Sequence, residues 1–199
     1  MNRFYEELAG IYRLRVPFEA IYTSVFLIRL STGPILVDCA TTDTDVDTVI
    51  LPALEEIGVS LSEIDGIVLT HRHGDHAGGL KRILEIVPDI DVIAHEGPIA
   101  DGLFAYALPG HTEDCIGVLD MRTHTLISGD GLQGAGVDKY RCYTQNPRAY
   151  LETIAKIQKD KRIQNVLFSH AYEPWFADRI LGRAAVLDCL TACLKYIER

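Results

Sequence analysis

The stretch HRHGDH at residues 71–76 decides how this sequence is interpreted. It places four side chains that can bind metal ions within six residues. In an extended loop, residues two apart point to the same side, so His71 and His73 can bind one cation. Asp75 and His76 point elsewhere and can bind a second cation. The composition of the chain produces this pattern by chance at a rate on the order of 10⁻³ per chain. We therefore interpret the stretch as a metal site.

Three later residues occupy a similar context. His111, Asp130 and His170 each follow an apolar segment that we predict to be a strand, and each precedes a turn. Taken singly, such residues more often serve as turn or capping residues. Because all three share one context, they favour convergence on one rim of a sheet scaffold, where loops carry function.

Hydrophobic periodicity predicts strands and helices in alternation around these positions. The expected strands lie at residues 23–30, 35–37, 65–70, 92–94, 104–108, 116–121, 126–128 and 165–169. One expected helix spans residues 46–57, with a cap in 43–45, and a second spans 80–87 and is ended by Pro88. Asn146 and Pro147 begin a third. A fourth lies in the tail from Trp175, with an apolar stripe made of Ile180, Leu181, Ala184, Leu187, Leu190 and Leu194. That stripe either covers a sheet or pairs with a second copy of the chain, which would give a homodimer.

The composition is that of a soluble globular protein of 199 residues, with 48% hydrophobic and 24% charged residues. Its net charge of −9 argues against a nucleic-acid partner, because Lys159, Lys161 and Arg162 form the only basic cluster. We expect no membrane span, since no apolar run approaches the required length of about 18 residues. We expect no export signal at the N-terminus. An odd number of cysteines, five, in a chain for which no export signal is expected predicts reduced thiols and a cytoplasmic location.

Together these residues resemble the metallo-β-lactamase-fold metal-dependent hydrolases, the superfamily that includes glyoxalase II, lactonases and tRNA 3′-processing endonucleases. The order His-x-His-x-Asp-His, followed by His111, Asp130 and His170, is similar to the signature of that superfamily. Leu36-Val37-Asp38 is similar to its earlier strand-end aspartate. The resemblance implies an α/β fold, a four-layer αββα sandwich with two mixed sheets face to face and helices outside. A single domain over residues 1–199 would form it.

The resemblance also implies a dinuclear metal site. By this resemblance, the first ion is held by His71, His73 and His111, and the second by Asp75, His76 and His170. Asp130 bridges the two ions. Asp38 lies behind the ligands and orients the loop or a ligand without touching metal. Imidazole and carboxylate ligands admit zinc, iron or manganese, and zinc is the default expectation.

Such a site implies hydrolysis of a small ester, thioester or lactone by a hydroxide that bridges the two ions. Asp75 would accept the proton of the water and pass it to the leaving group. True β-lactamases of this fold carry Cys or Ser where this chain has Asp130, which argues against antibiotic hydrolysis. Nearby aromatic residues either line the substrate pocket or pack in the ordinary way: Tyr140, Tyr143, Tyr172 and Trp175.

Three other functions stay open at this point. A mononuclear iron persulfide dioxygenase of this fold uses the equivalents of His71 or His73, His111 and Asp130. A phosphodiesterase or nuclease is disfavoured by the acidic charge. A non-catalytic metal-binding module is the third.

Glyoxalase II has an extra C-terminal helical domain, and we expect none here because only 29 residues follow His170.

Overall fold

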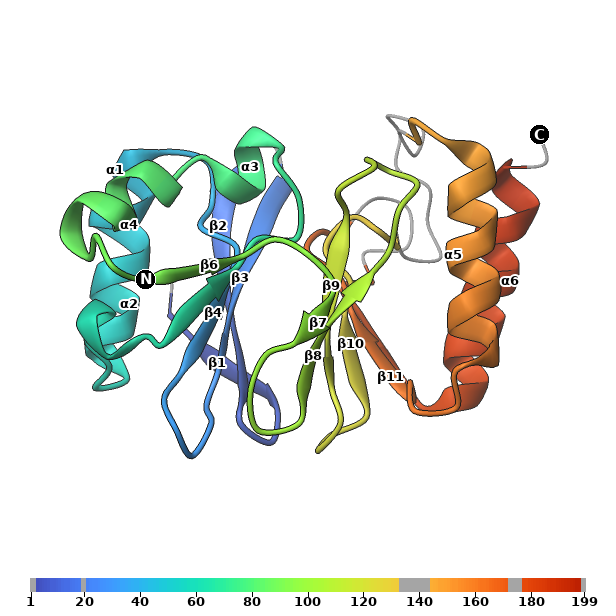
Figure 1. Cartoon of the computed structure of the whole chain (residues 1–199), viewed down its shortest axis with the longest axis horizontal. Coiled ribbons are helices and arrows are strands. Elements are labelled where there is room, and N and C mark those ends of the chain that lie inside the picture. Colours follow the sequence, from blue (N-terminus) through green and yellow to red (C-terminus); the bar gives the residue numbers. More distant parts are fainter. Residues whose placement is uncertain (1–2, 19–20, 133–143, 172–176, 198–199) are drawn as a thin grey trace. The chain divides into compact units, whose positions relative to one another are not determined.

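The computed structural model describes residues 3–18, 21–132, 144–171 and 177–197. The chain divides into two compact units, Met1–Ala94 and His95–Arg199. Each unit contains one six-stranded sheet and its own helices (Figure 1). That the two units act as a single domain stays a prediction. Within the described residues, no helix is both long and apolar enough to cross a membrane.

The sheet of the first unit is mixed. Its strands follow the order of the chain: β1 (Tyr5–Leu8), β2 (Ile11–Phe18), β3 (Ile21–Ile28), β4 (Ile35–Val37), β5 (Gly66–Val68) and β6 (Asp91–Ile93). Strands β1 to β4 pair antiparallel, and β4, β5 and β6 pair parallel. The strands expected at residues 23–30 and 35–37 are confirmed, and they form an antiparallel hairpin in which Phe26 of β3 pairs with Val37 of β4. Strands β1 and β2 were not predicted.

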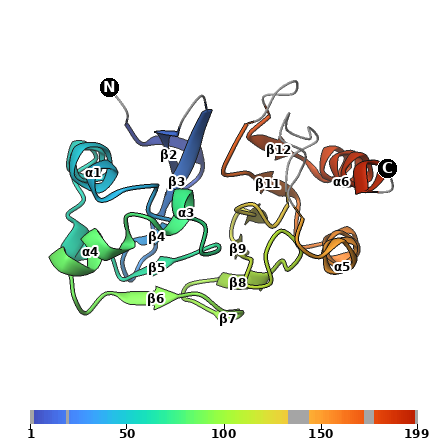
Figure 2. The same ribbon diagram turned by 90° about the horizontal axis from the view of Figure 1, so that it is seen from above.

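One face of this sheet forms a core with the helices of the unit. The helical segments are α1 (Asp43–Asp45), a π-helical segment η1 (Val46–Ile50), α2 (Leu51–Glu56), a short 3₁₀ turn η2 (Leu61–Glu63), α3 (Gly74–Ala77) and α4 (Leu80–Ile86). Residues at alternate positions of the strands, such as Leu14, Leu27 and Leu36, pack with Ile50 and Ile83 of the helices. Figure 2 shows α1, α2 and α4 on one side of the sheet.

The start of the first helix corrects one expectation. The N-cap is Thr42, whose hydroxyl accepts a hydrogen bond from the Asp45 backbone N–H at 3.1 Å, and the Asp45 carboxylate accepts one in return from the Thr42 N–H at 2.9 Å. This reciprocal capping box satisfies two backbone donors that the first turn leaves without partners. The residues expected to cap, 43–45, therefore lie inside the first turn.

The second unit also has a mixed sheet, with the strand order β12-β11-β10-β9-β8-β7. The strands are β7 (Gly97–Pro98), β8 (Leu103–Ala107), β9 (Ile116–Asp120), β10 (Thr125–Ile127), β11 (Asn165–Leu167) and β12 (Arg179–Leu181). Strands β10 and β11 pair parallel, and all other neighbours pair antiparallel. Helix α5 (Pro147–Lys159) makes the crossover between the parallel pair, which strands pointing the same way require.

Helices α5 and α6 (Arg183–Ile197) form the core of this unit with one face of its sheet. Asn146 caps α5 as predicted, accepting a hydrogen bond from the Ala149 N–H at 3.1 Å. The stripe predicted for the tail is confirmed only in part. Leu190 is buried, and Leu194 packs against the core of this unit. Ile180 and Leu181 instead lie in β12, which pairs with β11, and Ala184 and Leu187 are exposed. The buried face of α6 consists of Val186, Cys189, Leu190 and Cys193.

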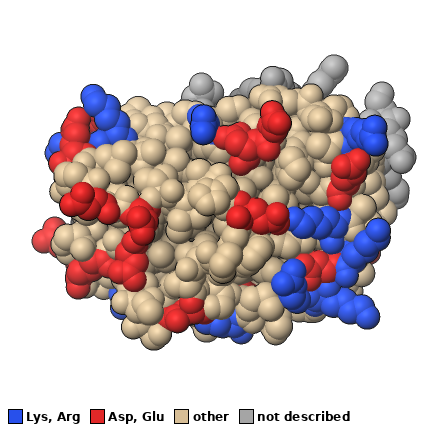
Figure 3. Space-filling model, viewed as in Figure 1, with Lys and Arg blue, Asp and Glu red and all other residues tan. Residues whose placement is uncertain are grey.

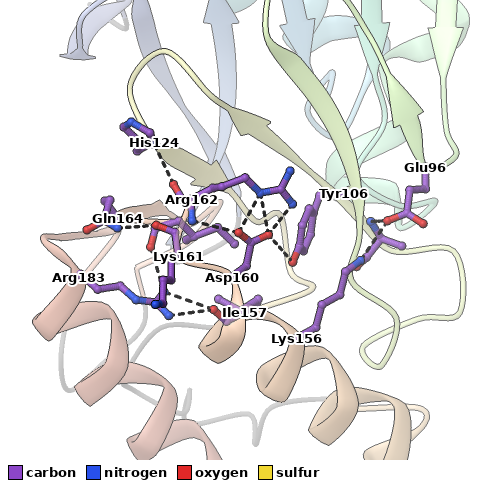
Figure 4. Close-up of polar contacts among 12 residues, drawn as sticks. Glu96, Tyr106, His124, Lys156, Ile157, Asp160, Lys161, Arg162, Gln164 and Arg183 are labelled. Atoms are coloured by element: carbon purple, nitrogen blue, oxygen red, sulfur yellow. Dashed lines mark hydrogen bonds and ion pairs between the residues drawn. The ribbon is translucent and has the colours of Figure 1, made fainter.

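Polar contacts fix the C-terminal end of α5 (Figure 4). The Asp160 carboxylate accepts hydrogen bonds from the Arg162 guanidinium at 2.6 and 2.9 Å and from the Tyr106 hydroxyl at 3.2 Å. Arg183 donates to the carbonyl oxygens of Gln158 at 2.6 Å and Ile163 at 2.9 Å. The bond to Gln158 satisfies a carbonyl group that the last turn of α5 leaves open. Both bonds of Arg183 join α6 to the end of α5 and the segment that follows it.

We predict a pH-dependent loss of stability for Asp160→Asn. The hydrogen bonds from Arg162 lower the pKa of Asp160 from 3.8 to about 2. A carboxyl group with a lowered folded-state pKa stabilises the fold above its unfolded value and loses that contribution as the pH falls through its folded value. Urea denaturation should show a free energy of unfolding lower by roughly 1 kcal/mol at neutral pH. The difference from wild type should narrow below about pH 4 and close near pH 2.

Asp188→Asn, which changes an exposed carboxyl group on α6, is the matched control and should leave the denaturation midpoint unchanged. A deficit of Asp160→Asn that stays constant over this pH range contradicts the assignment.

Candidate metal centre

In the first unit, strand direction gathers the site residues at one sheet edge. Strands β4 and β5 are parallel, with Val37 in register with Val68, so their carboxyl ends lie side by side. Asp38 follows β4, and His71 follows β5 after two residues. The Asp38 N–H donates to the Val68 carbonyl at 2.9 Å, which extends the pairing by one bond.

The Asp38 carboxylate is fully buried and accepts three hydrogen bonds. They come from the Thr70 backbone N–H at 2.8 Å, the Thr70 hydroxyl at 2.9 Å and Nδ1 of His76 at 2.8 Å. Because the carboxylate can only accept, Nδ1 of His76 carries a proton. In a neutral imidazole, the lone pair then lies on Nε2, the nitrogen left to bind metal. Asp38 thus holds the imidazole of His76 in place, and its role behind metal ligands stays a prediction.

The loop after β4 has an unusual backbone. Asp38 and Ala40 have φ angles of 63° and 60°, a left-handed backbone conformation that residues other than glycine rarely adopt. The loop is stabilised by contact with α3, where the Gly78 N–H donates to the Ala40 carbonyl at 3.0 Å. A Cβ on Gly78 would overlap the Thr41 carbonyl, and a Cβ on Gly79 would overlap the Cys39 carbonyl. The two glycines are needed here for close packing.

The imidazoles of the motif form a tight cluster. The His71 ring centroid lies 4.6 Å from that of His73 and 4.2 Å from that of His76. Nε2 of His76 faces Oδ2 of Asp75 at 3.4 Å. This distance exceeds a normal hydrogen bond. It is close to the separation of about 3.3 Å expected for two ligand atoms in a tetrahedral shell with bonds of 2.0–2.1 Å.

In the second unit, three strands with the same direction carry the remaining site residues. Strand β9 runs antiparallel to both β8 and β10, and β11 runs parallel to β10. Strands β8, β10 and β11 therefore point the same way, and His111, Asp130 and His170 follow their carboxyl ends. All three residues are buried. The predicted convergence at strand ends is confirmed within this unit.

The N-terminal part of α5 holds the loop that carries His111. The Thr153 hydroxyl donates to the Pro109 carbonyl at 2.7 Å, and the Gln145 N–H donates to the His111 carbonyl at 3.2 Å. Gly110 has a φ of 146°, and a Cβ on it would collide with Tyr150 at 2.6 Å. The loop thus lies flat on the helix, which fixes the direction of His111.

Asp130 lies between the two histidines of this unit. Its Oδ2 is 3.7 Å from Nε2 of His111, and its Oδ1 is 3.4 Å from Nε2 of His170. Each carboxylate oxygen thus faces a different imidazole. That Asp130 bridges two ions, as the resemblance implies, stays a prediction.

The chemistry of the donor set fits divalent metal ions with nitrogen and oxygen ligands. Two cysteines near these residues are buried, and no candidate metal-binding group among the described residues contains a cysteine. Burial, and secondarily the charge of Asp38, raises the pKa of the Cys39 thiol. Burial raises the pKa of Cys115 to about 11. Both thiols therefore stay protonated at neutral pH in the metal-free protein.

The structure brings the predicted site residues together as two sets. The first unit unites His71, His73, Asp75 and His76 with Asp38, and the second unites His111, Asp130 and His170. That the two sets bind the same ions stays a prediction. Sequence reasoning missed Thr70, although its position directly before the motif was a usable signal. The predicted pocket aromatics lie outside the described residues: Tyr140, Tyr143, Tyr172 and Trp175.

Comparison with known proteins agrees with the expected resemblance. Residues 19–100 match the metallo-beta-lactamase superfamily model. A hydroxyacylglutathione hydrolase of Francisella tularensis subsp. holarctica is 29% identical over 122 residues, which cover 53% of this chain and 48% of the relative. One of Francisella philomiragia is 31% identical over 112 residues, or 48% and 44% of the two chains. The chain spans about half the length of the curated relatives that it matches.

Solved structures show the fold. A metallo-beta-lactamase from Pontibacter korlensis superposes with a TM-score of 0.76 at 15% identity, covering 100% of both chains. The metallo-beta-lactamase FIM-1 of Pseudomonas aeruginosa, in its mono-zinc form, gives a TM-score of 0.74 at 18% identity, covering 98% of this chain and 96% of that one. The predicted fold class and the resemblance are confirmed.

We predict that Gly78→Ala destabilises the protein by about 1–3 kcal/mol, the usual cost of overpacking. The added methyl group forces α3 away from the loop after β4, on which Asp38 lies. Chemical denaturation measures the effect. Gly74→Ala is the matched control, because a Cβ there meets no atom within 4 Å. Equal stability of the two variants would show that this close packing is unimportant.

Proposed function

We propose that this protein, which has the metallo-β-lactamase fold and its metal-binding motif, is a metal-dependent hydrolase of a small ester, thioester or lactone. The observation that supports the proposal is the close approach of carboxylate oxygens and imidazole nitrogens in both units. Asp75 faces Nε2 of His76 at 3.4 Å, and Asp130 faces Nε2 of His111 and His170 at 3.7 and 3.4 Å. Carboxylate oxygens and imidazole nitrogens are ligands that divalent transition metals prefer.

The donor set suits two divalent ions. His71, His73 and His111 would hold the first, and Asp75, His76 and His170 the second, with Asp130 contacting both. When bound, these ions supply Lewis acidity, which makes water nucleophilic near neutral pH and draws electrons from a carbonyl group. FIM-1, which has the same fold, is described in a mono-zinc form, which supports zinc as the metal.

Two carboxylates of the first unit have different tasks. The Asp38 side chain has no exposed surface, whereas that of Asp75 is 17% exposed. Asp75 can therefore meet a water molecule, and Asp38 cannot. We assign to Asp75 the transfer of a proton from the attacking water to the leaving group. Asp38 holds Nδ1 of His76 and stays out of the reaction.

The relatives and the charge distribution support a small-molecule substrate. The Francisella relatives are named hydroxyacylglutathione hydrolases, which favours a thioester within the proposed class. Residues 1–94 carry 7 basic and 15 acidic residues, and residues 95–199 carry 12 and 13. On the face shown in Figure 3, basic side chains of the second unit alternate with acidic ones. A polyanion such as nucleic acid would require a continuous basic surface.

We also propose that the protein acts in the cytoplasm. The four described cysteines, Cys39, Cys115, Cys189 and Cys193, are all free thiols, which a reducing compartment maintains.

We predict that Asp130→Ala loses metal and lowers hydrolysis by more than about 100-fold, the upper loss expected for a residue that only orients a ligand. Metal analysis should find close to two transition-metal ions per wild-type chain. Turnover is measured with thioester, lactone and bis-nitrophenyl phosphate substrates. Asp188→Ala, at an exposed site on α6, is the control and should behave as wild type.

Full activity of metal-stripped protein would contradict the proposal. One iron ion per chain, together with oxygen uptake on glutathione persulfide, would establish the dioxygenase instead. Turnover of the phosphodiester alone would indicate the phosphodiesterase.

A further inference from the structure

We propose that the Thr70 hydroxyl is a positioning group that donates its proton to Asp38 and accepts a hydrogen bond from His71. In this way it fixes which nitrogen of His71 is left to bind metal. The inference rests on the proposed metal site and deepens it. It is carried by a buried chain of side chains in the first unit, in which Thr70 stands between Asp38 and His71.

The distances define this chain. Thr70 Oγ1 lies 2.9 Å from Oδ2 of Asp38 and 3.2 Å from Nδ1 of His71. Nδ1 of His76 lies 2.8 Å from the same carboxylate oxygen and 3.4 Å from Thr70 Oγ1. All four side chains are buried, with exposures of 0 or 1%. The short contacts thus run from His71 through Thr70 to Asp38, and separately from His76 to Asp38.

Counting protons gives the direction of each bond. A threonine hydroxyl has one proton to donate and lone pairs that accept. Hydrogen bonds to an ionised carboxylate are shorter and stronger than those between neutral groups. The hydroxyl proton therefore goes to Asp38, at the shorter distance. A lone pair of Thr70 Oγ1 then faces Nδ1 of His71, and that nitrogen must donate.

The consequence is that one carboxylate sets two imidazole tautomers. Asp38 places the proton of His76 on Nδ1 directly, and it places the proton of His71 on Nδ1 through Thr70. Both rings then keep the Nε2 lone pair for metal. Fixing the tautomer and ring orientation before metal arrives raises affinity, because no rearrangement is needed on binding.

The backbone part of this arrangement does not depend on the hydroxyl. The Thr70 N–H donates to Oδ1 of Asp38 at 2.8 Å, and any residue at position 70 except proline retains that bond. Thr70→Val is nearly isosteric and replaces the hydroxyl with a methyl group. Thr70→Ser keeps the hydroxyl and removes a methyl group. The pair of variants separates the hydrogen bond from the packing.

The first test is histidine ¹⁵N nuclear magnetic resonance on metal-free protein, at a pH above the range in which imidazole titrates. The signals of the seven histidines are assigned with single His→Gln variants. In wild type and Thr70→Ser, His71 should carry its proton on Nδ1. In Thr70→Val, His71 should shift toward the Nε2–H form, whereas His76 should not change, because Asp38 still accepts from it.

A wild-type His71 protonated on Nε2 would overturn the proposal without any variant. The same holds if His71 keeps its Nδ1 proton in Thr70→Val, or if Thr70→Ser loses it.

The second test is metal affinity by chelator competition. Thr70→Val should bind zinc roughly 10- to 100-fold more weakly than wild type, the range for residues that orient metal ligands, and Thr70→Ser should bind much as wild type does. Equal affinities of Thr70→Val and wild type would contradict the positioning role. Neither test measures hydrolysis, so a protein that binds metal but hydrolyses none of the substrates would refute the proposed function alone.

Discussion

The convergence of carboxylate oxygens and imidazole nitrogens is the constraint on which the candidate site depends. Carboxylate oxygens of Asp75 and Asp130 face imidazole nitrogens at 3.4–3.7 Å, which is longer than a normal hydrogen bond. A cation bound between carboxylate and imidazole ligands would compensate for the free energy that burying such polar groups costs. The strands that carry these residues bring them together within each unit before any ion is bound.

Strand direction is what places the groups. In each unit the site residues follow strands that run the same way, β4 and β5 in the first unit, and β8, β10 and β11 in the second. The two units then secure their loops differently. The first uses a left-handed backbone at Asp38 packed against Gly78, and the second lays the His111 loop on α5. Rigid elements support both sets, as precise ligand geometry requires.

The sequence allowed most of the site to be predicted, because metal ligands with fixed spacing are a local signal. His71, His73, Asp75 and His76 lie within six residues, and each later candidate ligand follows an apolar strand. The role of Thr70 was missed because it arises from contact with Asp38, 32 residues away. Its position directly before the motif marks Thr70 as a candidate, but the local sequence pattern does not identify Asp38 as its partner.

The fold elements that were missed have similar physical causes. Strand β2 has one charged residue, Arg13, at a position that should be apolar. Arg13 is fully buried, pairs with Glu7 of β1 at 2.6 Å and donates to Ser24 of β3 at 2.9 Å. Only the neighbouring strands make that burial tolerable. In the tail, apolar Ile180 and Leu181 continued a helical pattern, and pairing with β11 overrode it.

X-ray absorption at the metal edge of the purified, metal-loaded protein tests the central claim most directly, because it reports which atoms surround the ion. The account predicts a shell of nitrogen and oxygen atoms at about 2.0–2.1 Å, with the outer scattering of several imidazole rings. It also predicts a second metal at about 3.5–4 Å. A sulfur shell at about 2.3 Å, or a spectrum without imidazole scattering, would contradict it.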